Sequence, residues 1–187
     1  MGTEMPVLET ERLIIRPFVP EDVDRIGIVN EERDMDINRQ YILGTIATVK
    51  HLADLYQPPY GERAAVLKTE ELMICVVGLV PCLMPFEQLA YFTEGVAPAD
   101  VVPSTPEVGM YWACDPAYRR QGYATEAAQA LVDYAFKNMN LKRIVATTEY
   151  DNFESQGVMR KLGMTIERNP LPDPHYMQVV GILEHGG

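Results

Sequence analysis

The sequence is poor in the residues that mark several classes of protein. Its three cysteines, Cys75, Cys82 and Cys114, are an odd number without metal-ligand spacing, and its three histidines do not cluster. We therefore expect no metal, and we expect the cysteines to be buried as reduced core residues. No run approaches the roughly 18 apolar residues that span a membrane, and the first residues lack the pattern of a signal peptide. These absences predict a cytoplasmic protein without a membrane partner.

Positive charge is also scarce. The chain has 16 Lys and Arg against 27 Asp and Glu, which gives a formal net charge of −11. Proteins that bind nucleic acid neutralise phosphates with clustered cations, so this balance argues against a nucleic-acid partner. Internal repeats and low-complexity segments are absent as well, which excludes solenoids and propellers. The 187 residues, 47% of them hydrophobic, predict a single domain over residues 1–187 with a sizeable core.

Helical and alternating apolar patterns follow one another along the chain. The strongest is an apolar face at helical spacing over residues 124–137. In chain order we expect a strand at 12–18, a helix at 20–33, a weaker helical pattern within 34–60, a hairpin of 64–67 and 72–83, a surface loop at 85–106, a strand at 108–114, the helix at 124–137, a strand at 143–148, a helix at 153–162, and closing strands at 164–167 and 177–183. This order predicts a mixed α/β fold.

A basic, glycine-containing turn precedes the strongest helix. It reads Arg119-Arg-Gln-Gly-Tyr-Ala124. Gly122 lets the backbone approach a ligand closely, and the first amides of the following helix form an anion site. The turn is neither a Walker loop nor a dinucleotide fingerprint, because both glycine patterns are missing. Spacing alone leaves two readings open, a pyrophosphate site or a basic connection with a glycine for tight packing.

Three motifs in the right order resemble the GNAT N-acetyltransferases. The segment 115–127 resembles the family's acetyl-CoA motif Q/R-x-x-G-x-G/A, in which Arg119, Gly122 and Ala124 fill the fixed positions. Residues 151–155 and 161–164 resemble the N-x-x-S and K-L-G-F signatures. Upstream, the stretch 10–17 is similar to the opening strand of the ribosomal-protein-alanine type.

The resemblance implies a GNAT fold and a cofactor site. In that fold the central, mostly antiparallel sheet has flanking helices and two parallel strands that splay apart, here 108–114 and 143–148. Acetyl-CoA would be the co-substrate, without a metal. The residues implied to bind it are Trp112, Ala113, Cys114, Arg119, Arg120, Gln121, Gly122, Tyr123, Ala124, Thr125 and Asn152. For the two arginines, simple solvation is the alternative.

The resemblance also implies direct acetyl transfer to an amine, with proton transfer at both partners. Glu107 is our predicted base and Glu167 the reserve, with an exposed strand-end acid as the alternative for Glu167. Ser155 is the predicted acid, and Asn152 positions the reactants. Capping of the following helix is the alternative for Ser155 and an additional role for Asn152. Many members carry their acid as a tyrosine where this chain has Met159.

The acceptor is predicted as a class only. It is a primary amine, either a protein N-terminus or a small molecule. Acids near the first helix would attract a cationic acceptor, and the alternative, which is the usual role of such charge runs, is that they merely solvate the helix. A second hypothesis is a non-catalytic, acyl-CoA-binding sensor or interaction module. A third, a nucleotide-phosphate binder of unrelated fold, leaves the motifs around Asn152 and at 161–164 unexplained. Homodimer formation stays open.

Overall fold

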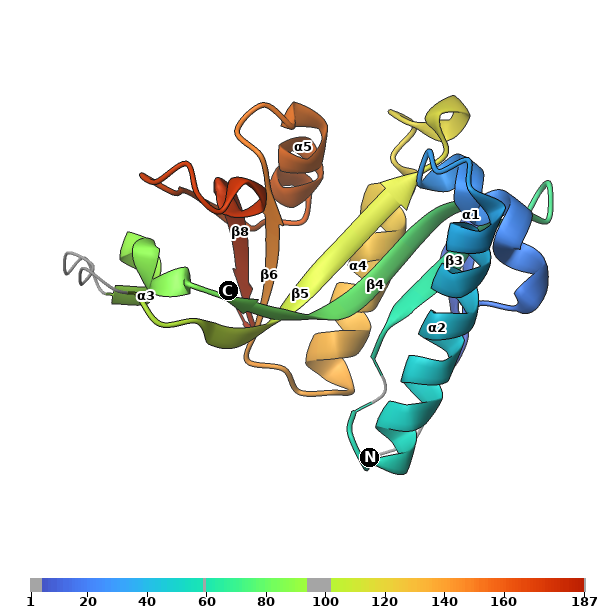
Figure 1. The fold of residues 1–187 in the computed structure, drawn as a ribbon, viewed down its shortest axis with the longest axis horizontal. Coiled ribbons are helices and arrows are strands. Elements are labelled where there is room, and N and C mark those ends of the chain that lie inside the picture. Colours follow the sequence, from blue (N-terminus) through green and yellow to red (C-terminus); the bar gives the residue numbers. More distant parts are fainter. Residues whose placement is uncertain (1–4, 59, 94–101, 187) are drawn as a thin grey trace. The chain divides into compact units, whose positions relative to one another are not determined.

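The computed structural model describes residues 5–58, 60–93 and 102–186 (Figure 1). The chain divides into two compact units. The first comprises Met1–Val80 with Tyr111–Met139, and the second comprises Pro81–Met110 with Asn140–Gly187. Among the described helices, none combines the length and apolar character needed to cross a membrane. The single domain over residues 1–187 stays a prediction.

The strands of the first unit lie in the order β1-β2-β3-β4-β5. They are β1 (Leu8–Glu9), β2 (Leu13–Arg16), β3 (Glu62–Leu67), β4 (Leu72–Met84) and β5 (Thr105–Cys114), of which β4 and β5 each continue into the second unit. Antiparallel pairing joins β1 to β2, β2 to β3 and β3 to β4. The predicted hairpin is therefore confirmed as β3 and β4.

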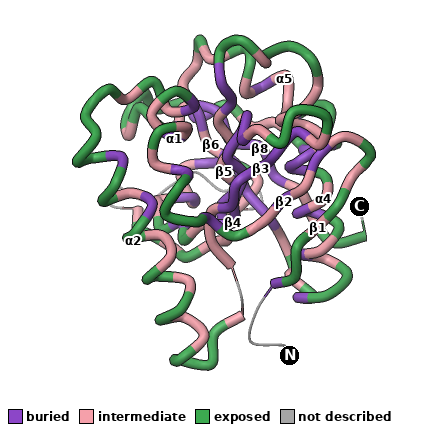
Figure 2. Tube along the Cα trace, turned by 90° about the vertical axis from the view of Figure 1, so that its right-hand side faces the viewer, coloured by how far each residue is buried: buried purple, intermediate pink, exposed green. Residues whose placement is uncertain are grey.

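Helices cover both sides of this part of the sheet. They are α1 (Val23–Val29), preceded by the turn Pro20–Asp22, then α2 (Met35–Asp54) and α4 (Tyr123–Lys137). Figure 2 shows α1 and α2 on one side of β2, β3 and β4, with α4 on the other. The apolar face predicted for α4 is buried along its length at Ala127, Ala128, Leu131, Val132 and Ala135.

The second helix is longer than the sequence pattern indicates. It begins at Met35, where the Asp34 side chain accepts hydrogen bonds from the amides of Asp36 and Ile37 at 2.8 and 3.3 Å. Only Asn38 and Ile42 are fully buried along its 20 residues. Because the buried stripe is so narrow, the apolar periodicity is weak, although the N-cap itself is a good one.

In the second unit the strand order is β5-β6-β8-β7. The new elements are β6 (Arg143–Thr148), α5 (Phe153–Lys161), β7 (Thr165–Arg168) and β8 (Val179–Glu184), with a short helical turn at His175–Met177. The strands β5 and β6 are parallel and are paired at one position, Gly109 with Val145. With antiparallel pairs elsewhere and flanking helices, the predicted fold class is confirmed.

The prediction of a surface loop over 85–106 is wrong at its start and at its end. Residues Phe86–Gln88 and Ala90–Thr93 form two short helices, and β5 already begins at Thr105. Phe86 and Leu89 are buried in the second unit with Met177 and Val180, and this packing orders a segment that has little periodicity. Residues 94–101 lie outside the described part.

The expectation of three reduced cysteines is wrong for two of them. Cys75 of β4 and Cys114 of β5 form a disulfide, while Cys82 is a free, buried thiol. The paired residues are 39 positions apart in the sequence. Their pairing depends on the adjacency of β4 and β5, which spacing alone does not reveal.

Candidate functional site

The glycine-containing turn connects β5 to α4 through two left-handed residues. Asp115 caps the short helix Pro116–Tyr118 by accepting a hydrogen bond from the Ala117 amide at 2.9 Å. The chain then passes through Arg120 at φ 62° and Gly122 at φ 85° before α4 begins. The first amides of α4 have no intrahelical partners, as at any helix N-terminus, and the N-cap Gly122 has no side chain that could accept from them. This end of the helix can therefore accept an anion.

The entrance to the turn is tied to α1. The Arg25 side chain donates from Nη2 to Asp115 Oδ2 at 2.6 Å and from Nε to the Met73 carbonyl at 3.0 Å. The Asp115 amide in turn donates to the Ile74 carbonyl at 2.9 Å. The start of the turn is thus fixed to both α1 and β4.

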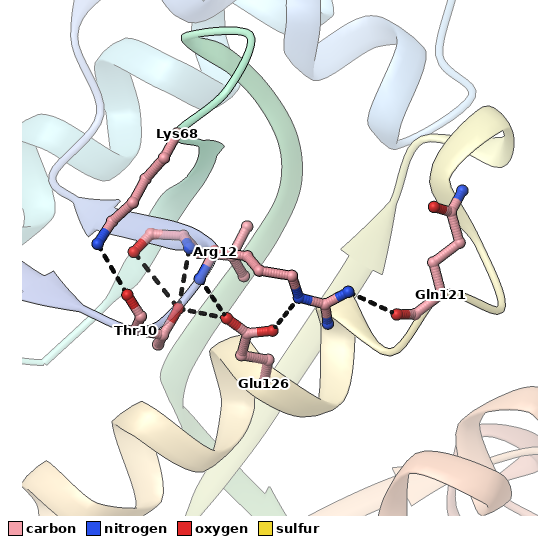
Figure 3. A network of polar contacts seen from close by, with 6 residues as sticks. Thr10, Arg12, Lys68, Gln121 and Glu126 are labelled. Carbon is pink, nitrogen blue, oxygen red and sulfur yellow. Dashed lines mark hydrogen bonds and ion pairs between the residues drawn. The ribbon is translucent and has the colours of Figure 1, made fainter.

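The exit of the turn is fixed by a network that we call the Arg12–Glu126 clamp, made of Thr10, Arg12, Gln121 and Glu126 (Figure 3). Glu126 of α4 accepts hydrogen bonds from Thr10 Oγ1 at 2.5 Å, the Arg12 amide at 2.9 Å and Arg12 Nε at 2.6 Å. Arg12 Nη1 donates to the Gln121 carbonyl at 3.0 Å, and its guanidinium lies 4.2 Å from the centre of the Tyr123 ring. One arginine thereby joins β2 to both sides of Gly122.

The clamp controls the protonation of Glu126. Partial burial by itself would raise the pKa of this carboxyl, but hydrogen bonds from Thr10 and Arg12 and the charge of Arg12 outweigh it, so the pKa is lowered. Glu126 is therefore held as a carboxylate. Its negative charge at the start of α4 also suits the helix dipole.

The residues predicted to bind the cofactor from β5 to α4 lie together in the first unit. Trp112 and Ala113 are half-buried on β5, and Ala124 and Thr125 form the first turn of α4. Arg119 donates from Nε to the Cys114 carbonyl at 3.0 Å and also forms an ion pair with Glu31. An anionic ligand would compete with Glu31 for that guanidinium.

Not all acids near the first helix are free to attract a cation. Asp22 is buried and accepts two hydrogen bonds from Arg16, at 2.7 and 2.8 Å. Glu31 is paired with Arg119, as described above. The acidic group that the sequence places on this helix is thus partly neutralised within the first unit.

The predicted base Glu107 is engaged in an ion pair in the second unit. Its carboxylate accepts hydrogen bonds from Nε of Arg143, at 3.1 Å, and from Nη2 of the same side chain. Arg143 also donates to Glu184 at 3.2 Å, and its hydrogen bonding to Glu107 is the largest cause that raises the pKa of Arg143. To take up a proton, Glu107 would have to give up this pair.

The predicted residues Asn152 and Ser155 lie at the start of α5. The Asn152 side chain accepts a hydrogen bond from the Ser155 amide at 3.0 Å, which confirms its capping role. Ser155 is not the cap, and among the described residues its hydroxyl has no hydrogen-bond partner. The hydroxyl is therefore available to a ligand.

Two further residues of the second unit bear on the predicted chemistry. Met159 of α5 is completely buried, and a Cβ built on Gly181 of β8 would meet its sulphur at 3.1 Å. Met159 is a core residue here. Glu167, the reserve base, is half-buried on β7 opposite Val180.

The clamp is not evident from the sequence. Thr10 and Arg12 belong to the stretch that resembles the family's opening strand, and no local pattern indicates their contacts with Glu126. Within the described ranges no group of His, Cys, Asp and Glu could hold a metal ion.

Comparisons with known proteins agree on one family. The model of the acetyltransferase (GNAT) domain matches residues 12–165. The N-acetyltransferase YnaD of Bacillus subtilis (strain 168) is 31% identical over 164 residues, which cover 86% of this chain and 83% of the relative. The structure of ribosomal-protein-S5-alanine acetyltransferase from Vibrio fischeri has a TM-score of 0.65 at 18% identity and covers 97% and 98% of the two chains. RimL, a ribosomal L7/L12 alpha-N-protein acetyltransferase solved with coenzyme A, has a TM-score of 0.65 at 14% identity, with coverages of 96% and 98%.

Proposed function

The chain belongs to the GNAT acetyltransferases, and we propose that it transfers the acetyl group of acetyl-CoA directly to a primary amine. The observation that carries the proposal is the turn before α4, whose free amides are held in place from both sides by Arg25 and by the Arg12–Glu126 clamp. A rigid set of amides at a helix N-terminus suits the diphosphate of coenzyme A.

The cofactor would lie along the residues that the sequence predicts. Its diphosphate would rest on the amides from Gln121 to Ala124, with Arg119 and Arg120 adding charge. Its pantetheine would pair with the backbone of 112–114. Asn152 would contact the cofactor or orient the acceptor while it caps α5.

Direct transfer requires that the amine lose protons and that the leaving thiolate gain one. Ser155 is our proposed acid, supported by its unpartnered hydroxyl in the first turn of α5. Glu107 remains the base predicted from the sequence, and a comparison of Glu107→Gln with wild type in the same assay tests that role. Because acetyl-CoA is already activated, correct positioning of the two substrates supplies much of the rate.

We expect Ser155→Ala to lower kcat by about 10–100-fold and to change the affinity for acetyl-CoA by no more than about threefold, because only a proton donor is lost. The cap depends on the Ser155 amide, which the substitution keeps, so thermal stability should be nearly unchanged. Steady-state kinetics and calorimetry measure the two effects. An unchanged kcat would remove Ser155 from the mechanism.

A non-catalytic acyl-CoA-binding module is the second candidate. It is favoured by the absence of a tyrosine at Met159 and by the ion pair that occupies Glu107. Thiol release from acetyl-CoA, measured with a panel of primary amines that includes alanyl peptides and polyamines, separates the two. Amine-dependent release establishes transfer, whereas tight acetyl-CoA binding without release with any amine supports the module.

The kind of amine that serves as acceptor is predicted from the sequence alone. Two of the similar solved structures are named as acetyltransferases of ribosomal proteins. For this chain we propose either a protein N-terminus or a cationic small molecule as the acceptor. The cytoplasmic location and a homodimer likewise stay predictions.

A further inference from the structure

A half-buried carboxylate lies on the α1 and α2 side of the first unit, away from every motif of the sequence analysis. Glu62 begins β3 and pairs with Gly78 of β4. A Cβ on Gly78 would lie 2.8 Å from Glu62 Cγ, closer than such contacts are found. The missing side chain at Gly78 therefore leaves the room that Glu62 occupies.

Two tyrosines surround this carboxylate. Tyr41 comes from α2 and Tyr111 from β5, and both pack against the apolar cluster that contains Phe18 and Val76. The Tyr111 hydroxyl donates to Asn30 Oδ1 at 3.4 Å. The Tyr41 hydroxyl is fully buried and has no hydrogen-bond partner of good geometry in the described part of the chain. Glu62 and Asn30 are among the polar side chains that act on this hydroxyl, and a buried hydroxyl without a well-aligned partner is costly in a core.

The pKa shifts of Glu62 and the two tyrosines also indicate an unusual environment. Burial raises the pKa of Glu62, and interaction with Tyr41 only partly opposes this. Burial and then the charge of Glu62 raise the pKa of Tyr111, and the same two causes act first on Tyr41. None of the ion pairs found within residues 5–58, 60–93 and 102–186 includes Glu62. A half-buried carboxylate without a cation costs some folding free energy, and such groups are found more often at functional sites.

Glu62 also lines a cavity of about 420 Å³ in the first unit. The wall from α2 is largely apolar and includes Ile46, Val49 and Ala53, while Lys50 and Asp54 are exposed at the rim. Arg63 lines the cavity too. Its Nη1 and Nη2 donate to the carbonyls of Met5 and Pro6, while its buried Nε has no partner among the described residues. The cavity thus combines apolar walls with the half-buried carboxylate of Glu62, and the exposed carboxylate of Asp54 lies beside it.

We propose that this cavity binds the acceptor as a primary ammonium on an apolar stem, and that Glu62, in place of the predicted base Glu107, holds the ammonium and takes up its proton. The inference rests on the proposed function. With the diphosphate at 121–124 and the pantetheine along 112–114, the thioester would lie near Tyr111. Phe18 lines the cavity and belongs to the apolar cluster against which Tyr111 packs, so an ammonium held by Glu62 would lie on the side of the first unit that Tyr111 faces.

The chemistry balances with these groups alone. The ammonium gives one proton to the Glu62 carboxylate and becomes a neutral amine. The amine nitrogen attacks the thioester carbonyl carbon, a C–N bond forms and the C–S bond breaks. The second proton lost by nitrogen ends on the leaving sulphur, and Glu62 returns its proton to water.

Calorimetry of the protein saturated with coenzyme A tests the pocket without turnover. Hexylamine is the probe, and the uncharged 1-hexanol is its isostere. We expect wild type to bind hexylamine about 10–100-fold more tightly than 1-hexanol, the range of a charge-assisted hydrogen bond in a partly buried site. Glu62→Gln should bind both probes equally. The variant should fold, since a buried amide costs less than a buried carboxylate.

Asp133→Asn is the matched control, because it removes one exposed acid of the same unit from α4. It should keep the preference for hexylamine. If Glu62→Gln keeps the preference as well, or if wild type has none, the inference is overturned.

The pH dependence gives a second readout that misfolding does not imitate. Protonation of Glu62 should abolish the preference for hexylamine as the pH falls. Because the pKa of Glu62 is raised, the preference should already be lost at a pH above 4.5. Tyr41 and Tyr111, with raised pKa values, and Arg63, whose burial lowers its pKa to about 10, keep their charge states there. Lys50 and Asp54 also face the cavity, so Asp54→Asn is measured in parallel and should retain the same profile.

Turnover separates this inference from the proposed function. If hexylamine binds through Glu62 but no amine releases thiol from acetyl-CoA, the pocket stands and the transfer reaction fails. If other amines are acetylated equally well by wild type and Glu62→Gln, the reaction stands and the role of Glu62 fails.

Discussion

Gly122→Glu should abolish the binding of acetyl-CoA, with an affinity at least about 100-fold below that of wild type. Two effects combine. The residue sits at φ 85°, where a side chain costs about 1–2 kcal/mol. A new carboxylate would also lie beside the expected diphosphate, and a Cβ there is already 3.4 Å from Arg12 Nη2. The carboxylate would compete with Glu126 for Arg12 and would repel the ligand.

Two variants separate these effects in a calorimetric titration with acetyl-CoA. Gly122→Ala carries the strain without the charge and should lose about tenfold in affinity. Gly44→Glu places the same side chain on α2, where a Cβ meets nothing within 4 Å, and should bind as wild type does. Binding by Gly122→Glu within threefold of wild type would contradict the assignment of the turn.

The parts of the fold that the sequence predicts are those with local signals. The helix α4 was predicted to within one residue because a wide apolar face repeats along it, and β6 was predicted over residues 143–148 from its composition. The helix α2 was underestimated because its buried stripe is narrow. Local periodicity reflects how much of an element is buried, so half-exposed helices give little of it.

The site was predictable where its residues are close in the sequence. The turn from Arg119 to Ala124 is continuous, and motif spacing identified it. The clamp joins Arg12 to Glu126 over 114 positions, and the charge of Glu62 on β3 acts on Tyr111 of β5 only because both strands belong to one sheet. The disulfide of Cys75 and Cys114 likewise joins residues that are far apart in the sequence. Such contacts are set by strand adjacency, which a single sequence does not contain.

Glu126→Gln should lower both the stability of the protein and its affinity for acetyl-CoA. The substitution keeps the size of the side chain but removes the charge that accepts from Thr10 and twice from Arg12. Charge-assisted hydrogen bonds contribute about 1.5–3 kcal/mol, and because Arg12 is 38% exposed we expect about 1–2 kcal/mol in the free energy of unfolding. The turn would lose its attachment to β2, so the Kd for acetyl-CoA should rise about 3–10-fold.

The stability difference between wild type and Glu126→Gln should depend on pH in one direction. The pKa of Glu126 is lowered in the folded protein, so its contribution is fully present above the unfolded value of about 4.3 and is lost as pH falls through the folded pKa. Denaturant unfolding at pH 7 and at pH 3 measures this, and the two proteins should converge in acid. A difference of the same size at both values would show that Glu126 acts by packing and not by charge.

Glu31→Gln is the control that distinguishes the clamp from any ion pair near the turn. Glu31 pairs with Arg119, but its side chain is 60% exposed, and exposed pairs contribute little to stability. Its loss should therefore leave unfolding nearly unchanged. It also frees Arg119 for the diphosphate, so the affinity for acetyl-CoA should stay equal or increase. If Glu31→Gln lowers the affinity for acetyl-CoA as much as Glu126→Gln does, the loss of any negative charge near the turn explains both effects. The clamp then has no special role in holding the turn.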